Sequence, residues 1–307
     1  MRTVAQAFGR IPDKHVLHLA AIMLFFWAIC DGIASFIVPI VLVERGISGT
    51  VMGLIIGSSS FAGAIFDLVL CRLLPNTNFR RIFIATILLS ALFPLILWKG
   101  TALWMFFVAM AIWGLYFDLY RIGTYDLVSR FTKDGDYASR FGVLQVMISL
   151  GILLAPFLAG FLMDGATVGS RPFIAALIFL AFAGLFCLVL IHATAHSARY
   201  TATSIRTSIG IFQELRIWRR LSDRLLPVLL LTLMLNVMSG FYWTIGPLFA
   251  ETFESLGRFS GLFLAAYIAP ALVVGWFIGG VTRRYGQRRT AVAALFVGSL
   301  ILTGFAF

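Results

Sequence analysis

Nine long apolar runs, separated by short polar connectors, make up most of this chain. The runs cover approximately residues 16–43, 51–71, 82–98, 102–124, 141–163, 172–193, 226–250, 259–281 and 290–307. A helix of about 20 apolar residues is long enough to cross the hydrocarbon core of a bilayer. The sequence therefore predicts an all-α polytopic membrane protein in which consecutive helices are antiparallel neighbours.

Arginine and lysine gather on alternate connectors. If the N-terminus lies in the cytoplasm, that side collects almost all of the 24 Lys and Arg residues. The opposite side receives Arg45, Lys99, Arg171 and Arg258, and Arg121 lies inside or at the edge of a run. This is the positive-inside pattern of multispanning proteins. We therefore expect a multi-pass protein of the cell (inner or plasma) membrane with a cytoplasmic N-terminus.

The composition excludes an ordinary soluble domain. Hydrophobic residues make up 61% of the chain and charged residues 12%, whereas charged residues are about a quarter of a soluble domain. The net charge of +11 sits in short loops that set topology and contact anionic headgroups, so we expect no nucleic-acid partner. His192 and His196 have helical metal-pair spacing without a third ligand nearby. We expect no metal, no cofactor and no enzymatic activity.

The connector from Thr194 to Leu225 is longer than the others. It divides the chain into a predicted six-helix bundle (1–193), a basic cytoplasmic linker (194–225) and a partial bundle of three helices (226–307). The second part of the linker has the pattern of a basic amphipathic helix on the membrane surface; a disordered linker is the alternative. Because transporters are often built from two matching halves, we expect a C-terminally incomplete chain, either a natural fragment or one that ends early.

Three local sequences carry a family resemblance. The connector after the eighth run reads GGVTRRYGQRR, with glycines and basic residues at Gly279, Arg284, Gly286, Arg288 and Arg289. The corresponding sequence, which begins within the second run and continues through the next connector, retains a glycine and an acid, Gly63 and Asp67, and Arg80 and Arg81 offer a trailing basic pair. The fifth run places small residues and a proline at Gly142, Gly151, Pro156 and Gly160, with alanines at 155 and 159.

These loops resemble the signature loops of the major facilitator superfamily, and the fifth run resembles a helix of its proton-coupled drug antiporters. The resemblance implies a twelve-helix fold, of which this chain contains nine helices, and transport by alternating access. In the fifth helix, small residues and a proline allow close helix approach and bending. Uptake carriers also have such helices, so this motif favours export only modestly.

Asp31 is the principal candidate for transport chemistry. It lies about fifteen residues into the first run, or roughly 22 Å along a helix, near the bilayer midplane. A charged Asp at that depth costs about 2.5–3.5 kcal/mol, so we expect it to face a water-filled cavity or to carry a proton. The resemblance implies a proton-coupling role, because drug antiporters often have an acid in this helix; a structural Asp bonded to a neighbouring helix is the alternative.

Polar and aromatic residues of other runs are further cavity candidates, each equally explained by helix packing. They are Gln145, Asn236, Tyr242 and Trp243. A second candidate group is a charge network at the cytoplasmic end that breaks when this side opens. Its members are Asp67, Arg72, Asp118, Arg121 and Asp126. The alternative is an interfacial cluster in which Arg121 reaches lipid phosphate.

These observations predict a secondary active transporter that exports small apolar or amphipathic compounds in exchange for protons. Its expected partners are the substrate, protons and the bilayer, and we expect a monomer if the chain is full length. We expect no basic residue in the cavity at the midplane, which disfavours anionic substrates. The alternatives are an uptake carrier of the superfamily for a sugar or other metabolite, a non-transporting fragment and a membrane-bound enzyme.

Overall fold

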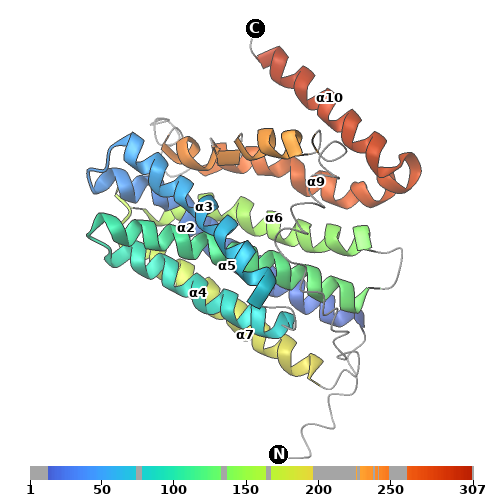
Figure 1. The fold of residues 1–307 in the computed structure, drawn as a ribbon, viewed down its shortest axis with the longest axis horizontal. Helices are drawn as coiled ribbons and strands as arrows, with labels where there is room; N and C mark the ends of the chain where they lie inside the picture. Colours follow the sequence, from blue (N-terminus) through green and yellow to red (C-terminus); the bar gives the residue numbers. More distant parts are fainter. Residues whose placement is uncertain are drawn as a thin grey trace, which may run out of the picture.

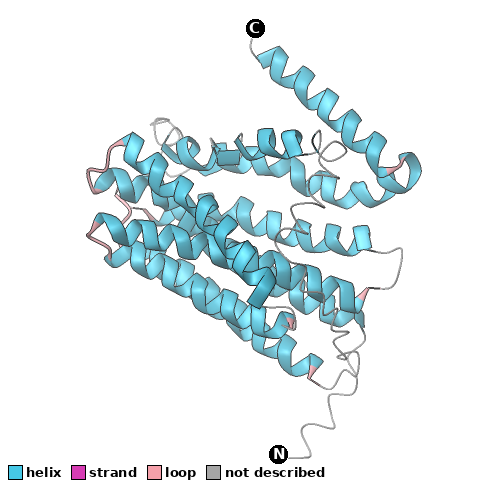
Figure 2. Ribbon diagram, in the orientation of Figure 1, coloured by secondary structure: helices cyan, strands magenta, loops and turns pink. Residues whose placement is uncertain are grey.

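A computed structural model describes residues 13–73, 78–132, 137–163, 167–195, 226, 229–237, 239–240, 242–248 and 261–305. The described residues form helices joined by short loops (Figures 1 and 2). In the first part of the chain the helices are α2 (Asp13–Glu44), α3 (Gly49–Leu73), α4 (Phe79–Lys99), α5 (Leu103–Phe131), α6 (Tyr137–Leu162) and α7 (Arg171–Thr194). Described positions between 229 and 248 are also helical, followed by α9 (Gly261–Tyr285) and α10 (Gln287–Phe305).

The prediction of a polytopic helical protein is confirmed. Seven helices of the described chain, α2 to α7 and Leu229–Leu248, are long and apolar enough to cross a membrane. Helix ends lie within a few residues of the predicted runs except in α5, which continues to Phe131 rather than ending near residue 124. Hydropathy marks the part of a helix that lies in lipid, and the polar residues after Thr124 simply extend the same helix beyond it. Residues 196–225, which include most of the predicted linker helix, lie outside the described part of the chain.

Helix α2 is the central helix of the bundle. It packs mainly against α6 and α7, while α4 packs against α5 and α7, and α3 packs against α5 (Figure 1). In its most apolar window, 89% of α2 is buried, compared with 22% to 39% for α3 to α7. A side chain on α2 therefore faces protein rather than lipid in nearly every direction, which makes this helix a suitable carrier for a buried acid.

Small residues bring α2 and α6 together. A Cβ added to Gly151 of α6 would lie 2.6 Å from the carbonyl oxygen of Phe25 and 2.8 Å from Cβ of Ala28. A Cβ on Gly32 of α2 would lie 2.5 Å from Cβ of Ala155. The backbones therefore approach as the small residues of the fifth run predict. In the same motif, Pro156 is buried without ending α6, and the partly buried glycines lie at 142 and 160.

A similar close approach joins α3 to α5. A Cβ on Gly114 of α5 would collide with the carbonyl oxygen of Ser59, and one on Gly63 of α3 would lie 2.7 Å from Oδ2 of Asp118. Gly63 therefore provides the space that the Asp118 side chain occupies. This contact places an acid of α5 against α3, because Gly63 and Asp67, the matched residues of the second signature sequence, lie within that helix rather than in a loop.

Helix α9 packs against α6 and thereby connects the later helices to the first six. Figure 1 shows α10 extending away from the other helices. Gly286 lies between α9 and α10 with φ of +82°, a left-handed conformation that glycine adopts without steric cost. Of the other signature residues, Gly279 accepts a hydrogen bond from Arg283 Nε at 3.2 Å, Arg284 lies over the Tyr285 ring, and Arg288 lies in the first turn of α10.

Candidate transport cavity

Asp31 lies in the middle of α2 with 8% of its surface exposed. Its Oδ1 atom accepts two hydrogen bonds from α5, one from Nε1 of Trp113 at 2.9 Å and one from the Tyr116 hydroxyl at 2.7 Å. Both donors lie on the face of α5 that packs against α2, because they are three residues apart. The carboxyl group is therefore held in one orientation by two donors that are themselves buried or half-buried.

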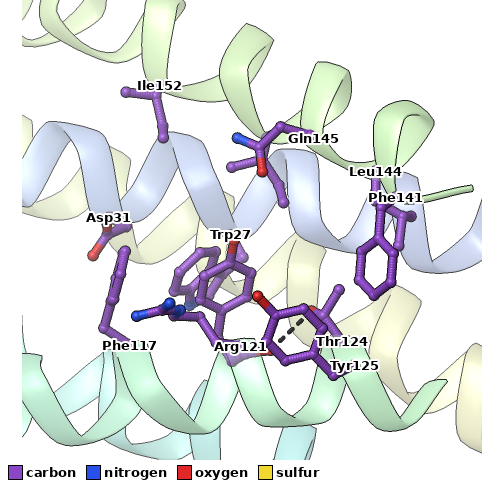
Figure 3. A pocket seen from close by; sticks show the side chains of 12 residues that line it. Trp27, Asp31, Phe117, Arg121, Thr124, Tyr125, Phe141, Leu144, Gln145 and Ile152 are labelled. Atoms are coloured by element: carbon purple, nitrogen blue, oxygen red, sulfur yellow. Dashed lines mark hydrogen bonds between the residues drawn. The ribbon is translucent and has the colours of Figure 1, made fainter. Parts of the chain in front are cut away.

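Asp31 also lines a cavity of about 320 Å³ between α2, α5 and α6 (Figure 3). The lining residues are Trp27, Asp31, Phe117, Tyr120, Arg121, Thr124, Tyr125, Phe141, Leu144, Gln145, Ile148 and Ile152. This volume is at the lower end of the range for small-molecule pockets. The structure thus combines the two interpretations of Asp31: the residue is bonded to a neighbouring helix and also faces a cavity.

The aromatic wall of the cavity is fixed by its own contacts. Trp27 donates its indole N–H to Ser90 Oγ on α4 at 2.9 Å, and its ring stacks on Tyr120 at a centroid distance of 4.3 Å. Phe117 packs edge-on against Tyr120 at 5.4 Å. Because these side chains are held in place before a ligand enters, binding an apolar ring against them costs little ordering entropy.

Arg121 is a basic residue of this cavity, whereas the sequence predicts a cavity with no basic residue at the midplane. It lines the same cavity as Asp31, and 55% of its side chain is exposed. On α5 the cavity residues Phe117, Tyr120, Arg121 and Thr124 follow the spacing of one helical face. The sequence predicts that Arg121 lies near the cytoplasmic end, because Asp118 is about 25 Å along a helix that starts at Thr101 on the outer side. Helix α5 continues beyond Arg121 to Phe131. The Cα atom of Arg121 therefore lies about ten residues, or about 15 Å, before the helix end.

The structure brings together only part of the predicted charge network. Nη1 of Arg121 lies 3.9 Å from Oδ1 of Asp118, and Asp67, which is exposed on α3, interacts electrostatically with Asp118. Asp126 differs from the expectation: it accepts a hydrogen bond from the backbone N–H of Phe79 at 2.9 Å and pairs with Arg130 at 2.7 Å. Its position at the N-terminus of α4 explains this arrangement, because free N–H groups there favour a carboxylate.

The Arg72 side chain lies outside the described part of the structure. The other predicted cavity residues are distributed as follows. Gln145 lines the cavity, and its Nε2 atom lies 3.4 Å from Ser149 Oγ. Asn236 is exposed and donates to the carbonyl of Thr232 at 2.8 Å. Tyr242 is buried against the core, and its ring centroid lies 5.2 Å from that of Trp243. Tyr242 and Trp243 do not line this cavity.

Sequence reasoning did not identify several lining residues, namely Phe117, Thr124, Tyr125, Phe141, Leu144, Ile148 and Ile152. For those on α5, namely Phe117, Thr124 and Tyr125, the signal in the sequence was helical spacing that places them near the face of Tyr120 and Arg121. Within the described residues, no group of three or more His, Cys, Asp or Glu side chains is arranged to hold a metal ion.

Comparison with known proteins gives two findings. The sequence profile of the Major Facilitator Superfamily matches residues 20–307. A tetracycline resistance protein of class G from Vibrio anguillarum is 24% identical over 227 residues, which are 74% of this chain and 56% of that protein. The chain thus matches little more than half the length of this curated relative. The profile match covers nearly the whole chain, including the cavity and both signature loops, so the chain belongs to the Major Facilitator Superfamily.

Proposed function

We propose that this chain forms the substrate-binding part of a secondary transporter that exports small amphipathic compounds in exchange for protons. The observation that carries the proposal is Asp31, a buried acid on the central helix that faces a preformed aromatic cavity. Intramembrane acids of this kind mark proton and ion pathways in transporters. Membership of the superfamily supports transport, and the similarity to a tetracycline resistance protein supports drug efflux.

Proton exchange follows from the composition of the cavity wall. Among the described residues that line the cavity, Asp31 is the only acid. In its charged form it attracts either a proton or a cationic group, and the two compete for one carboxylate. A carrier that releases its substrate when Asp31 is protonated couples the two movements, because binding free energies are reciprocal.

The charge pair on α5 supplies a candidate gate for the same cycle. Asp118 packs on Gly63 of α3 and lies within ion-pair range of Arg121. The α3–α5 contact is made by small residues, which permits sliding of packed helices, one of the movements that open transporters. We place the opening at this contact, where Asp118 exchanges partners as α3 moves.

The test is proton-driven dye efflux in everted membrane vesicles that contain the protein. Asp31→Asn is close in shape, and its amide oxygen still accepts from Trp113 and Tyr116, so the fold is expected to persist. We expect this variant to lose proton-driven dye movement and Asp31→Glu to retain part of it. Unchanged movement in the Asn variant would disprove Asp31 as the coupling residue. Dye movement only in right-side-out vesicles, toward the interior, would favour the uptake carrier.

A further inference from the structure

We propose that Arg121 and Asp31 form a two-charge binding site and that the compound it takes is a zwitterion with a flat apolar body. Arg121 would bind the anionic group, and Asp31 would bind the cationic group. The inference rests on the proposed function, since it names the substrate class of the same cavity. It also replaces the expectation, based on a cavity without basic residues, that anionic groups are disfavoured.

Arg121 has hydrogen-bond donors to spare. Within the described part of the chain its partner is Asp118, and the separation of 3.9 Å between Nη1 and Oδ1 exceeds the 2.7–3.2 Å of a hydrogen bond. More than half of the side chain is exposed. A guanidinium presents five N–H donors in a planar fork that fits a carboxylate or phosphate with two parallel bonds. The geometry therefore leaves this fork available to a ligand in the cavity.

Asp31 has the opposite charge at the other end of the same wall. Its Oδ1 atom accepts the hydrogen bonds from Trp113 and Tyr116, and Oδ2 is left for a ligand. Arg121 follows Tyr116 by five residues, which is about 7.5 Å along the axis of α5. In Figure 3 the guanidinium extends from α5 toward Phe117 and the Asp31 end of the cavity. Among the described residues, no ion pair joins Asp31 to Arg121.

Two charges of opposite sign that are not paired with each other select against ligands with a single charge. A monocation satisfies Asp31 and brings its positive charge into the field of Arg121. A monoanion satisfies Arg121 and meets the repulsion of Asp31. A zwitterion meets both with favourable contacts, and selection by such repulsion is a common source of specificity. The rings of Trp27, Tyr120 and Phe117 provide stacking surfaces for the apolar body between the two charges.

The experiment measures binding of a matched set of compounds by equilibrium dialysis with the purified full chain in detergent. The set is ciprofloxacin, a zwitterion; its methyl ester, a cation; its N-acetyl derivative, an anion; and tetraphenylphosphonium, an apolar cation. We expect the zwitterion to bind at least about tenfold more tightly than the ester or the N-acetyl compound, because each of these loses one charge-assisted contact.

Variants of Arg121 assign the anionic subsite. Arg121→Gln is expected to weaken zwitterion binding about tenfold and to tighten ester binding, because it also removes the positive charge that repels the cationic ester. Arg121→Lys retains the charge without the fork and is expected to fall between. Arg81→Gln removes one charge from an exposed position of α4 outside the cavity and is expected to change nothing. Each variant is first checked by size-exclusion chromatography for a single monodisperse peak.

Three outcomes overturn the proposal: equal affinity of wild type for ester and zwitterion, equal weakening of both by Arg121→Gln, and binding of tetraphenylphosphonium without binding of the zwitterion. These outcomes leave a cation-binding cavity and the proposed transport function standing. Absence of binding for every compound overturns both, because the cavity is then no substrate site.

Discussion

Replacing Gly32 with alanine tests whether close contact between α2 and α6 sets the position of Asp31. The new Cβ would lie 2.5 Å from Cβ of Ala155, whereas carbon atoms in contact prefer about 3.5–4.0 Å. A Cβ has no rotamer by which to move away, so α2 and α6 must separate by about 1 Å. Because Asp31 is the adjacent residue, its bonds to α5 must stretch or its helix must tilt.

The size of the effect follows from the neighbours of the new atom. Overpacking of this kind costs about 1–3 kcal/mol. Beyond Ala155, the next neighbours are the Cα and carbonyl oxygen of Ile152 at 3.5 and 3.8 Å, which are ordinary contacts. Ala155→Gly in the same chain therefore removes the collision, and the opposite helix propensities of the two changes largely cancel. We expect the free energy of unfolding of the double variant to lie within about 1 kcal/mol of that of the parent. The coupling energy between the two substitutions is then about 1–3 kcal/mol.

The assay is unfolding in mixed detergent micelles as the SDS fraction rises, read by helical circular dichroism, for the parent, both single variants and the double variant. Gly53→Ala is the matched control, because a Cβ at this exposed helical position meets nothing within 4 Å, and its stability should be equal or slightly higher. The reasoning fails if Gly32→Ala is as stable as the parent, or if Ala155→Gly does not restore it.

Three smaller predictions concern other contacts. Trp27→Phe should lower the free energy of unfolding by about 0.5–1.5 kcal/mol by leaving the Ser90 hydroxyl unpaired, and adding Ser90→Ala should recover part of the loss in the same SDS titration; no coupling between the two would contradict the bond. Asp126→Asn should cost about 1 kcal/mol at low salt and less at high salt, because it removes the charge that meets Arg130 and the start of α4; a cost that does not depend on salt would argue against this explanation. Gly286→Ala should cost about 1–2 kcal/mol by forcing alanine into the left-handed region, measured by proteolysis of the α9–α10 loop, and a cleavage rate equal to that of the parent would refute it.

The helices were largely predictable from the sequence because a bilayer imposes a length on every apolar run. The end of α5 was not, since residues such as Asp126 and Arg130 leave the lipid but stay in the helix. Asp31 was identifiable because a charge within an apolar run is costly and therefore stands out. In the fifth run, the small residues that match the antiporter motif predict close approach of two helices, and the distances at Gly151 show such an approach.

The cavity wall was much less predictable. Topology left Arg121 unexplained, yet local sequence does not record how α5 is rotated and extended relative to α6. The chain has 30 phenylalanines, and an inward Phe117 has the same local pattern as one that faces lipid. Only the packing of three helices distinguishes these cases, because it depends on contacts between residues far apart in the chain.

The hydrogen bond from Trp113 to Asp31 makes Trp113 an intrinsic fluorescent probe of the carboxyl group. The indole N–H lies 2.9 Å from the carboxylate oxygen, and the ring is stacked on Phe93 at 6.4 Å. Indole fluorescence responds to a charge that appears or disappears beside the ring. A proton or a cation that reaches Asp31 is therefore expected to change the emission wavelength and intensity of Trp113. In a variant whose other tryptophans are replaced by phenylalanine, the fluorescence of Trp113 would report protonation or cation binding at Asp31 over time, in a native membrane and without an attached label.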